Sequence, residues 1–426
     1  AVGAPRDSVK TLEGAMDVVC RYDDLSLPRV ADSASSLRTL ALACLKVSFL
    51  TVLTDAERAD YLSSVEKVDA ASARDMASLA SMLPTTSLCD GSFVSELVDS
   101  SLMKGVKAPS MDHAVVICQL ALRTEILLSS GGDDRLTLKM NAGRINKYFC
   151  STLPRSYVLR RGSCTCSPTT MAQFEIAERN RIAMLSKALK SAEKKSAQAC
   201  MDAAMEINDD IRYRLGKSLG IDTNDSRAHQ IVMFPSGSDA ELLPVYVALT
   251  RNPSKVFNFV TAAGEVGSGT PNAANMRHFS ALKTMGGKQE NNGCLAGYDG
   301  SSVELIEFKP RKTDGTADFR EQEIVSSIES KLSSAPGSLA VLHLVLGSKT
   351  GLICPSRNFL DTMRAKFGSS LIIVADACQL RCTAAFIKSL VDDGIVCLIT
   401  GSKFFSGPPF SGAVLLPASM STEIET

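Results

Sequence analysis

Short apolar runs alternate with longer segments of mixed polarity through the second half of the chain. These runs lie at 231–234, 256–262, 339–346, 371–375, 395–399 and 413–416. Apolar runs of this length are typical of strands that are buried on both faces of a parallel sheet. The segments between them include stretches with helical character. Strands that alternate with helices predict an α/β fold with a doubly wound, mostly parallel sheet.

The first half of the chain has a different pattern and is predicted to be helical. Ser36 to Val52 carries apolar residues at helical spacing, and Met111 to Leu128 forms a second, strongly apolar helix. Asp55 to Arg58 marks a helix start with acidic residues in its first turn. Residues 1–150 are therefore expected to be either an added helical domain or a partner-binding surface, without a catalytic constellation.

A linker and a long helix are predicted over residues 151–204. Three arginines, at 155, 160 and 161, precede a small polar loop at 162–168, which either lines a pocket or simply joins two domains. Met171 to Leu219 is a long, charged helical region that ends at Gly220. We expect the large α/β domain to occupy residues 205–426.

Charge and hydropathy narrow the class of protein. The 46 basic and 46 acidic residues give a formal net charge of +0, which argues against a protein that bulk charge holds on nucleic acid or on a membrane surface. No apolar run reaches the ~18 residues of a transmembrane helix, and the first 25 residues lack the core of a secretion signal. A cytoplasmic protein is expected.

The 13 cysteines are scattered without a disulfide framework. Cys44, Cys118 and Cys397 lie inside apolar segments, as expected of reduced thiols packed in an intracellular protein. Cys164 and Cys166 form a close pair, but their spacing does not match a zinc site, and no second pair or histidine cluster completes one. No metal is therefore expected.

Two charged residues follow neighbouring predicted strands. Asp376 comes after the strand at 371–375, and Lys403 follows the strand at 395–399 within Thr400-Gly401-Ser402-Lys403. Open α/β sheets bind their ligands outside the carboxyl ends of the strands. The two residues form either a surface ion pair or part of a site, and the ends of strands that face a crevice favour the site.

A glycine-containing turn follows the strand at 231–234 and leads into a helix. Its sequence is Ser236-Gly237-Ser238-Asp239-Ala240-Glu241. Such a turn offers backbone N–H groups to a phosphate. It lacks the Walker pattern and the three spaced glycines of dinucleotide-binding folds. A nucleotide-binding function is disfavoured further because no acidic ribose or magnesium partner lies at a recognisable spacing.

Taken together, these motifs resemble the pyridoxal-phosphate enzymes of the aspartate-aminotransferase fold (fold type I). Within that fold they are most similar to the class V aminotransferases, which include cysteine desulfurases. The shared features are the 236–241 turn, Thr350-Gly351 after the 339–346 strand, Asp376-x-x-Gln379 and Ser402-Lys403, in the family's order. The resemblance covers residues 205–417.

The resemblance implies pyridoxal 5'-phosphate as the cofactor and assigns the catalytic roles. Lys403 forms the Schiff base with the cofactor aldehyde, and Asp376 pairs with the protonated pyridine nitrogen. Lys349 is a rival for the Schiff base. It ranks second because only Lys403 lies in a Ser-Lys turn after the strand that follows Asp376. The other implied cofactor contacts are Gly237, Ser238, Asp239, Gln379, Ser402 and Thr350.

Two departures from the family pattern affect the expected function. An aromatic residue often stacks on the cofactor ring in this family, but Glu265 and Val266 lie at that position here. The family's small C-terminal domain, which supplies a carboxylate-binding arginine, is expected to be absent, and the start at Ala1 suggests a fragment. The glycine loop Gly264 to Thr270 is expected to lie beside the cofactor site of a homodimer.

The expected function is therefore that of a transferase or lyase that acts on an amino acid or amine. The alternative is an inactive relative that keeps the fold as a binding or scaffold module. The partners expected are a small-molecule substrate and a second copy of the chain, without nucleic acid or membrane. The residues leave transamination, elimination, decarboxylation and desulfuration open.

Overall fold

The structure is a computed structural model that describes residues 32–421 and 423 with internal gaps. The gaps are residues 52, 54, 84–91, 123, 129–144, 147, 152–153, 155–168, 193–196, 223–227, 280–282, 285–286, 289, 299 and 410. The polar loop at 162–168, its preceding arginines and the pair Cys164 and Cys166 lie outside the described residues.

The chain divides into two compact units. The first contains Ala1–Arg155, Met171–Ile207 and Lys283–Gly286, and the second contains Ser156–Thr170, Asn208–Leu282 and Gly287–Thr426. One of the points at which the chain passes between the units lies within helix α9 (Ala197–Leu219).

The first unit is mainly helical in its described residues. Its helices are α2 (Asp32–Leu50), α3 (Asp55–Glu66), α4 (Ala70–Met82), α5 (Ser92–Asp99), α6 (Met111–Ala121), α7 (Thr124–Leu127) and α8 (Met171–Ala192), with a 3₁₀ turn η2 (Ser101–Met103). Fully buried side chains such as Leu40, Phe93 and Ile117 form its core. The single helix predicted over Met111 to Leu128 is wrong, because α6 stops where Leu122 becomes extended (φ −63, ψ 151).

The second unit is built on a mixed sheet. Its strands are β1 (Gln230–Phe234), β2 (Val256–Val260), β5 (Val303–Glu307), β6 (Leu339–Leu346), β7 (Ile353–Cys354), β8 (Leu371–Ala377), β9 (Val396–Thr400) and β10 (Gly412–Leu416). The order is β1-β10-β9-β8-β6-β2-β5, and β7 pairs with β6. The pairs β9–β8, β8–β6, β6–β2 and β2–β5 are parallel, whereas β10 and β7 run antiparallel to their neighbours. Two further strands have two residues each: β3 (Lys283–Thr284), which belongs to the first unit, and β4 (Gly287–Lys288), which belongs to the second.

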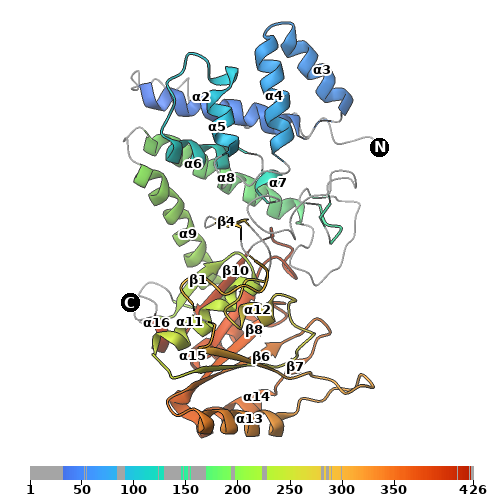
Figure 1. The fold of residues 1–426 in the computed structure, drawn as a ribbon, viewed down its shortest axis with the longest axis vertical. Coiled ribbons are helices and arrows are strands. Elements are labelled where there is room, and N and C mark those ends of the chain that lie inside the picture. The colour runs from blue at the N-terminus through green and yellow to red at the C-terminus, as the bar shows by residue number, and fades with distance from the viewer. Residues whose placement is uncertain are drawn as a thin grey trace. The chain divides into compact units, whose positions relative to one another are not determined.

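Helices cover both faces of this sheet (Figure 1). One face packs against α13 (Glu321–Ser334), α14 (Arg357–Phe367), α15 (Ala384–Asp392) and the end of α9. The opposite face packs against α10 (Gly237–Ala240), α11 (Leu242–Thr250) and α16 (Ala418–Ser421), and α12 (Thr270–Ala273) follows β2. The strand side chains alternate between the two cores, as the two-residue repeat of a strand requires. The predicted doubly wound, mostly parallel α/β fold is therefore confirmed.

Several boundaries differ from the sequence-based predictions. Strand β8 continues to Ala377, so Asp376 lies inside the strand rather than after it, and α15 begins only at Ala384. The predicted helical region Met171 to Leu219 contains two helices, α8 and α9. β5 and α13 were not predicted. β5 carries two glutamates at the edge of the sheet, so it lacks the apolar run of a central strand.

The described cysteines are free thiols, and Cys44, Cys118 and Cys397 are buried as predicted. Within the described residues, no helix has the length and hydropathy to cross a membrane. The same residues contain no group of three or more potential metal ligands.

Candidate active site

Buried polar side chains line one face of four adjacent strands. Asn258 on β2, His343 on β6, Asp376 on β8 and Thr400 on β9 are each at most 9% exposed. Their apolar neighbours at alternate positions pack on the α13–α14 face, so the two-residue repeat directs these four toward the α11 face. Asp376 lies opposite Val345, and His343 lies opposite Val374, so they are diagonal neighbours on adjacent strands.

The end of β8 holds the Asp376 carboxylate in a defined position. Its Oδ1 accepts a hydrogen bond from the backbone N–H of Cys378 at 3.0 Å. The Thr400 hydroxyl donates to the carbonyl of Cys378 at 2.6 Å and so joins the ends of β8 and β9. The Cys378 side chain also hydrogen-bonds to this carboxylate. Asp376 is therefore a nearly buried carboxylate that Cys378 holds at the end of β8.

Lys403 lies in the turn that follows β9 and acts electrostatically on the buried groups. Burial and the Asp376 charge raise the pKa of Cys378, whereas the Lys403 charge lowers it. Its amine makes no ion pair with a described residue. The preceding residue, Ser402, is 1% exposed. Lys349 is exposed, and its backbone N–H donates to the carbonyl of Glu265 at 3.0 Å. Lys403 is thus half-buried, whereas its rival Lys349 is exposed.

The 236–241 turn packs directly on the ends of β8 and β9. A Cβ added to Gly237 would lie 2.5 Å from Cys378 Sγ and 3.3 Å from Thr400 Cγ2, so only glycine fits without displacement. Ser236 caps α10 by accepting from the Asp239 N–H at 3.3 Å, and its hydroxyl donates to the Asp239 carboxylate at 2.5 Å. Asp239, predicted as a cofactor contact, is therefore engaged in capping the helix.

A buried acid lies at the end of this turn. Glu241 Oε2 is 3.2 Å from His343 Nδ1, and both side chains are 1% exposed. Burial and the Asp376 charge raise the pKa of Glu241 well above its usual range, although Thr270 and Lys403 act in the opposite direction. Burial lowers the pKa of His343 to about 4, and the Asp376 charge opposes this shift. Neither Glu241 Oε2 nor His343 Nδ1 has a hydrogen-bond partner among the described residues.

The glycine loop Gly264 to Thr270 packs on this turn within the same chain. A Cβ added to Gly269 would lie 3.0 Å from Ser238 Oγ, and the Thr270 hydroxyl is 3.5 Å from Glu241 Oε1. Val266 is 6% exposed and belongs to a small apolar cluster with Val260 and Val345. Val266 is therefore a core residue rather than a side chain free to cover a ring.

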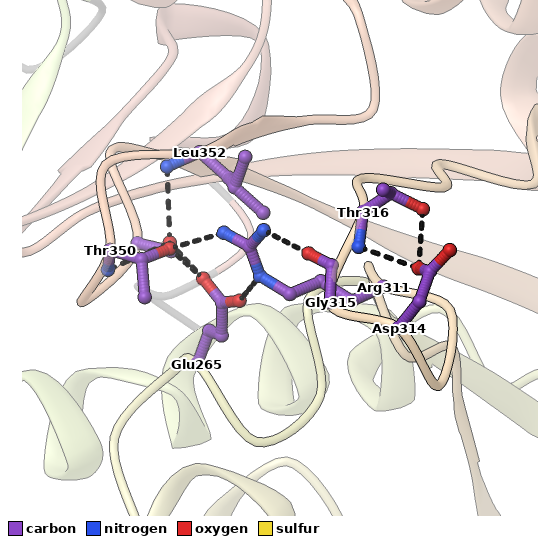
Figure 2. Close-up of polar contacts among 8 residues, drawn as sticks. Glu265, Arg311, Asp314, Gly315, Thr316, Thr350 and Leu352 are labelled. Carbon is purple, nitrogen blue, oxygen red and sulfur yellow. Dashed lines mark hydrogen bonds and ion pairs between the residues drawn. The ribbon is translucent and has the colours of Figure 1, made fainter.

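Glu265, the other residue at the expected stacking position, belongs to a second polar network (Figure 2). Its carboxylate is 2.5 Å from Arg311 Nε and accepts from the Ser348 hydroxyl at 2.6 Å and from the Thr350 hydroxyl. Arg311 also donates to the Gly315 carbonyl at 2.8 Å and to the Thr350 hydroxyl at 2.9 Å. Burial raises the pKa of Glu265, but these hydrogen bonds outweigh it and lower the pKa overall.

Arg381 connects this network to the turn that carries Lys403. Its Nη1 donates to the Ser348 carbonyl at 3.2 Å, and its guanidinium carbon lies 4.6 Å from the ring centroid of Phe404. Phe404 directly follows Lys403 and is 57% exposed. Thr350, predicted to face the cofactor, is thus held on Glu265 and Arg311 near the exposed side of this edge.

The predicted residues therefore fall into two groups. Gly237, Ser238, Asp376 and Ser402 lie around the ends of β8 and β9, and Gln379 is buried directly after β8 at 6% exposure. Thr350 belongs instead to the network around Glu265. Sequence reasoning missed His343 and Asn258, although each is a polar residue inside an apolar strand (LAVLHLVL and VFNFV).

No protein-family model and no curated protein matches the chain. Solved structures with a similar fold include the glutamate decarboxylase domain of a Vibrio parahaemolyticus diaminobutyrate-pyruvate transaminase and L-2,4-diaminobutyrate decarboxylase. It has 12% identity over 84% of this chain and 68% of that chain, with a TM-score of 0.40. Oryza sativa TDC with PLP and tryptamine has 14% identity over 56% and 50%, with a TM-score of 0.37. Mouse CSAD in the apo form has 14% identity over 61% and 49%, with a TM-score of 0.34.

The chain thus spans about half the length of the rice and mouse proteins. At these identities and TM-scores, the similarity identifies neither a family nor a reaction for this chain.

Proposed function

We propose that the second unit is a pyridoxal-phosphate-binding enzyme domain that acts on an amino acid or amine. The observation that carries this proposal is the Asp376 carboxylate, which is nearly buried at the end of β8 and makes no ion pair with a described residue. A buried carboxylate without a cationic partner is costly unless it serves a bound group. Lys403, which acts electrostatically on the adjacent Cys378, supplies the amine that the same chemistry requires.

The residues at this edge fit the cofactor. Asp376 Oδ2 would hold the protonated pyridine nitrogen, and the Lys403 amine would hold the aldehyde carbon covalently. Ser238 and Ser402, both nearly buried, would offer hydroxyl donors to the phosphate beside the close approach at Gly237. When bound, pyridoxal phosphate withdraws electrons from the substrate's α-carbon. The Lys403 amine would then move a proton at that carbon.

The reaction type, the oligomeric state and the cellular location are proposed from the sequence motifs. Transferase and lyase reactions both use a lysine amine and a buried acid, so the proposal includes either reaction. We also propose a cytoplasmic homodimer of class V type. A catalytically inactive binding or scaffold protein is the second candidate. Its support is that Val266 is packed in the core and Glu265 is engaged with Arg311, so neither residue at the expected stacking position is available to a ring.

Covalent trapping tests the proposal. Purified protein is incubated with pyridoxal phosphate, reduced with borohydride, digested and searched for a pyridoxyl adduct by mass spectrometry. We expect the adduct on Lys403, with loss of at least 90% (about tenfold) in Lys403→Ala. Lys349→Ala is the matched control and should keep the adduct.

The fold should survive Lys403→Ala because a lysine in a turn contributes little to the core, and circular dichroism checks this. An adduct on Lys349 would reassign the site. No adduct in the parent, together with normal folding, would support the inactive binding or scaffold protein.

A further inference from the structure

Arg381, in the turn after β8, carries a positive charge that no described carboxylate balances. Its Nη1 donates to the Ser348 carbonyl at 3.2 Å, and its Nε and Nη2 have no acceptor among the described residues. Arg311, at the same edge of the sheet, is by contrast paired with Glu265. The Nε and Nη2 donors of a guanidinium form a fork that matches a carboxylate. Arg381 therefore presents an open fork for an acidic group.

The Arg381 guanidinium is placed beside Lys403 by an aromatic ring. Its central carbon lies 4.6 Å from the ring centroid of Phe404, the residue that directly follows Lys403. Lys403 and Phe404 share a turn that is closed by a hydrogen bond from the Ser406 N–H to the Lys403 carbonyl at 3.1 Å. A cation over the face of a ring keeps the N–H donors at its own edge for other partners.

The backbone before Arg381 and the neighbouring loop both hold its side chain at this edge. The Leu380 N–H donates to the Ala377 carbonyl at 2.7 Å, and Leu380 has a φ of 49°, which is uncommon for a branched side chain. A Cβ added to Gly347 would lie 3.5 Å from Arg381 Cδ, so the arginine stem runs along this glycine. Residues with such backbone angles cluster at ligand sites.

We propose that Arg381 binds the α-carboxylate of the substrate, and that the substrate is therefore an amino acid rather than a simple amine. This inference rests on the proposed function, in which Lys403 brings the amino nitrogen of the substrate to this edge. The α-carboxylate is attached to the same carbon as that nitrogen, so a guanidinium beside Lys403 can meet it. Two parallel charge-assisted hydrogen bonds would hold the carboxylate. Phe404 acts through Arg381 as a positioning residue.

A purely structural role for Arg381 makes a different prediction. An arginine that only joins the turns at 347–351, 377–381 and 403–406 would affect every ligand of the site to the same extent. An arginine that binds the carboxylate affects only those ligands that carry one. The two roles are therefore separated by the ratio of two affinities measured in the same protein.

Two stable conjugates supply this ratio without turnover and without a covalent link to Lys403. They are N-(5'-phosphopyridoxyl)-L-alanine and N-(5'-phosphopyridoxyl)ethylamine, which differ by the carboxylate alone. The Kd of each is measured by titration calorimetry with the cofactor-free chain. We expect the parent to bind the alanine conjugate about tenfold or more tightly, because hydrogen bonds between charged groups are the stronger kind.

Three variants assign this preference to a residue. In Arg381→Gln the two Kd values should become nearly equal. Arg381→Lys keeps the charge without the fork, so a preference of about threefold should remain. Arg311→Gln is the matched control, since it removes the paired guanidinium of the same edge, and it should keep the parental ratio. Circular dichroism checks that each variant folds.

The outcomes separate this inference from the proposed function. Equal binding of both conjugates by the parent, or an unchanged ratio in Arg381→Gln, would overturn the role of Arg381 and leave the cofactor site standing. Loss of the preference in Arg311→Gln but not in Arg381→Gln would assign the carboxylate to Arg311. Binding of neither conjugate by the folded parent would contradict the proposed function and, with it, this inference. If Arg381→Gln does not fold, an undiminished preference in Arg381→Lys overturns the fork.

Discussion

Two polar clusters lie near the carboxyl ends of the strands of the second unit, and they use their hydrogen-bonding groups in opposite ways. In the network around Glu265, all three guanidinium nitrogens of Arg311 have acceptors. In the buried cluster, Glu241 Oε2, Asn258 Oδ1 and both ring nitrogens of His343 lack hydrogen-bond partners among the described residues. The satisfied network is partly exposed, whereas the unsatisfied cluster is buried.

The difference in hydrogen bonding suggests different roles for the two clusters, structural for the network around Glu265 and functional for the buried cluster. A satisfied network joins loops without needing a ligand, and partial exposure limits its contribution to stability. An unsatisfied buried polar group costs about 1–3 kcal/mol, so such a cluster persists where something other than stability requires it. The difference therefore supports Asp376 and its neighbours as the site of the proposed chemistry and a loop-holding role for Glu265 and Arg311.

The largest effect is expected from Asp376→Asn. The amide is nearly isosteric but cannot hold a proton on the pyridine nitrogen, so turnover of a responsive amino acid or amine should fall by about 100-fold or more. Cofactor retention should change less, because the Lys403 link and the phosphate contacts remain. Parallel measurement of kcat and cofactor Kd separates these effects. If Asp376→Asn turns over substrate as fast as the parent, Asp376 has only a structural role, and the proposed functional difference between the two clusters is wrong.

An intermediate effect is expected from Gly237→Ala. The new Cβ would lie 2.5 Å from Cys378 Sγ, which forces the 236–241 turn away from the ends of β8 and β9. We expect a loss of about 1–3 kcal/mol in the free energy of unfolding, together with weaker cofactor binding. Urea denaturation and a cofactor titration measure the two losses.

Cys378→Ala provides the matched background for this test, since it removes the clashing sulfur. There, the cost of Gly237→Ala should shrink to about 0.5 kcal/mol or less, because the remaining approach to Thr400 Cγ2 is 3.3 Å. An undiminished cost would mean that the turn is not held by this contact.

The sequence predicted the central sheet well because its strands are apolar on both faces. Strand β6 occupies Leu339–Leu346 as predicted, and β8 and β9 differ by one or two residues at their ends. The edge strand β5 was missed because its two glutamates interrupt the apolar pattern. Helix α6 ended early because the Leu122 backbone becomes extended, which the continuous apolar run did not indicate.

The site was only partly predictable for a different reason. Asp376 and Lys403 stand out because charged residues follow apolar strands. The proximity of Glu241 and His343 depends on which strand faces the 236–241 turn, and only the strand order supplies that information. Thr350 lies beyond a predicted strand as expected, but Arg311 comes from a segment without a predicted element, so its network was not predictable.

The smallest effect is expected from Glu265→Gln, which tests the other half of the comparison. Arg311 is 32% exposed, so the ion pair should contribute at most about 1 kcal/mol to the free energy of unfolding. The pKa of Glu265 is lowered in the fold, so its contribution is present above its unfolded value of about 4.3 and disappears as pH falls through the lowered folded value. Parent and Glu265→Gln should therefore differ at neutral pH and converge in acid.

Borohydride labelling of Lys403 should be the same in both proteins, because Glu265 holds a loop and does not contact the proposed ring. A drop in labelling by more than about threefold, without a matching loss of stability, would exceed what a screened surface pair can cause. That result would mean that the network of Figure 2 is part of the proposed cofactor site and that the two clusters do not have separate roles. Equal labelling of the parent and Glu265→Gln, with a small loss in the free energy of unfolding that disappears in acid, would instead support the buried cluster as the site of the proposed chemistry.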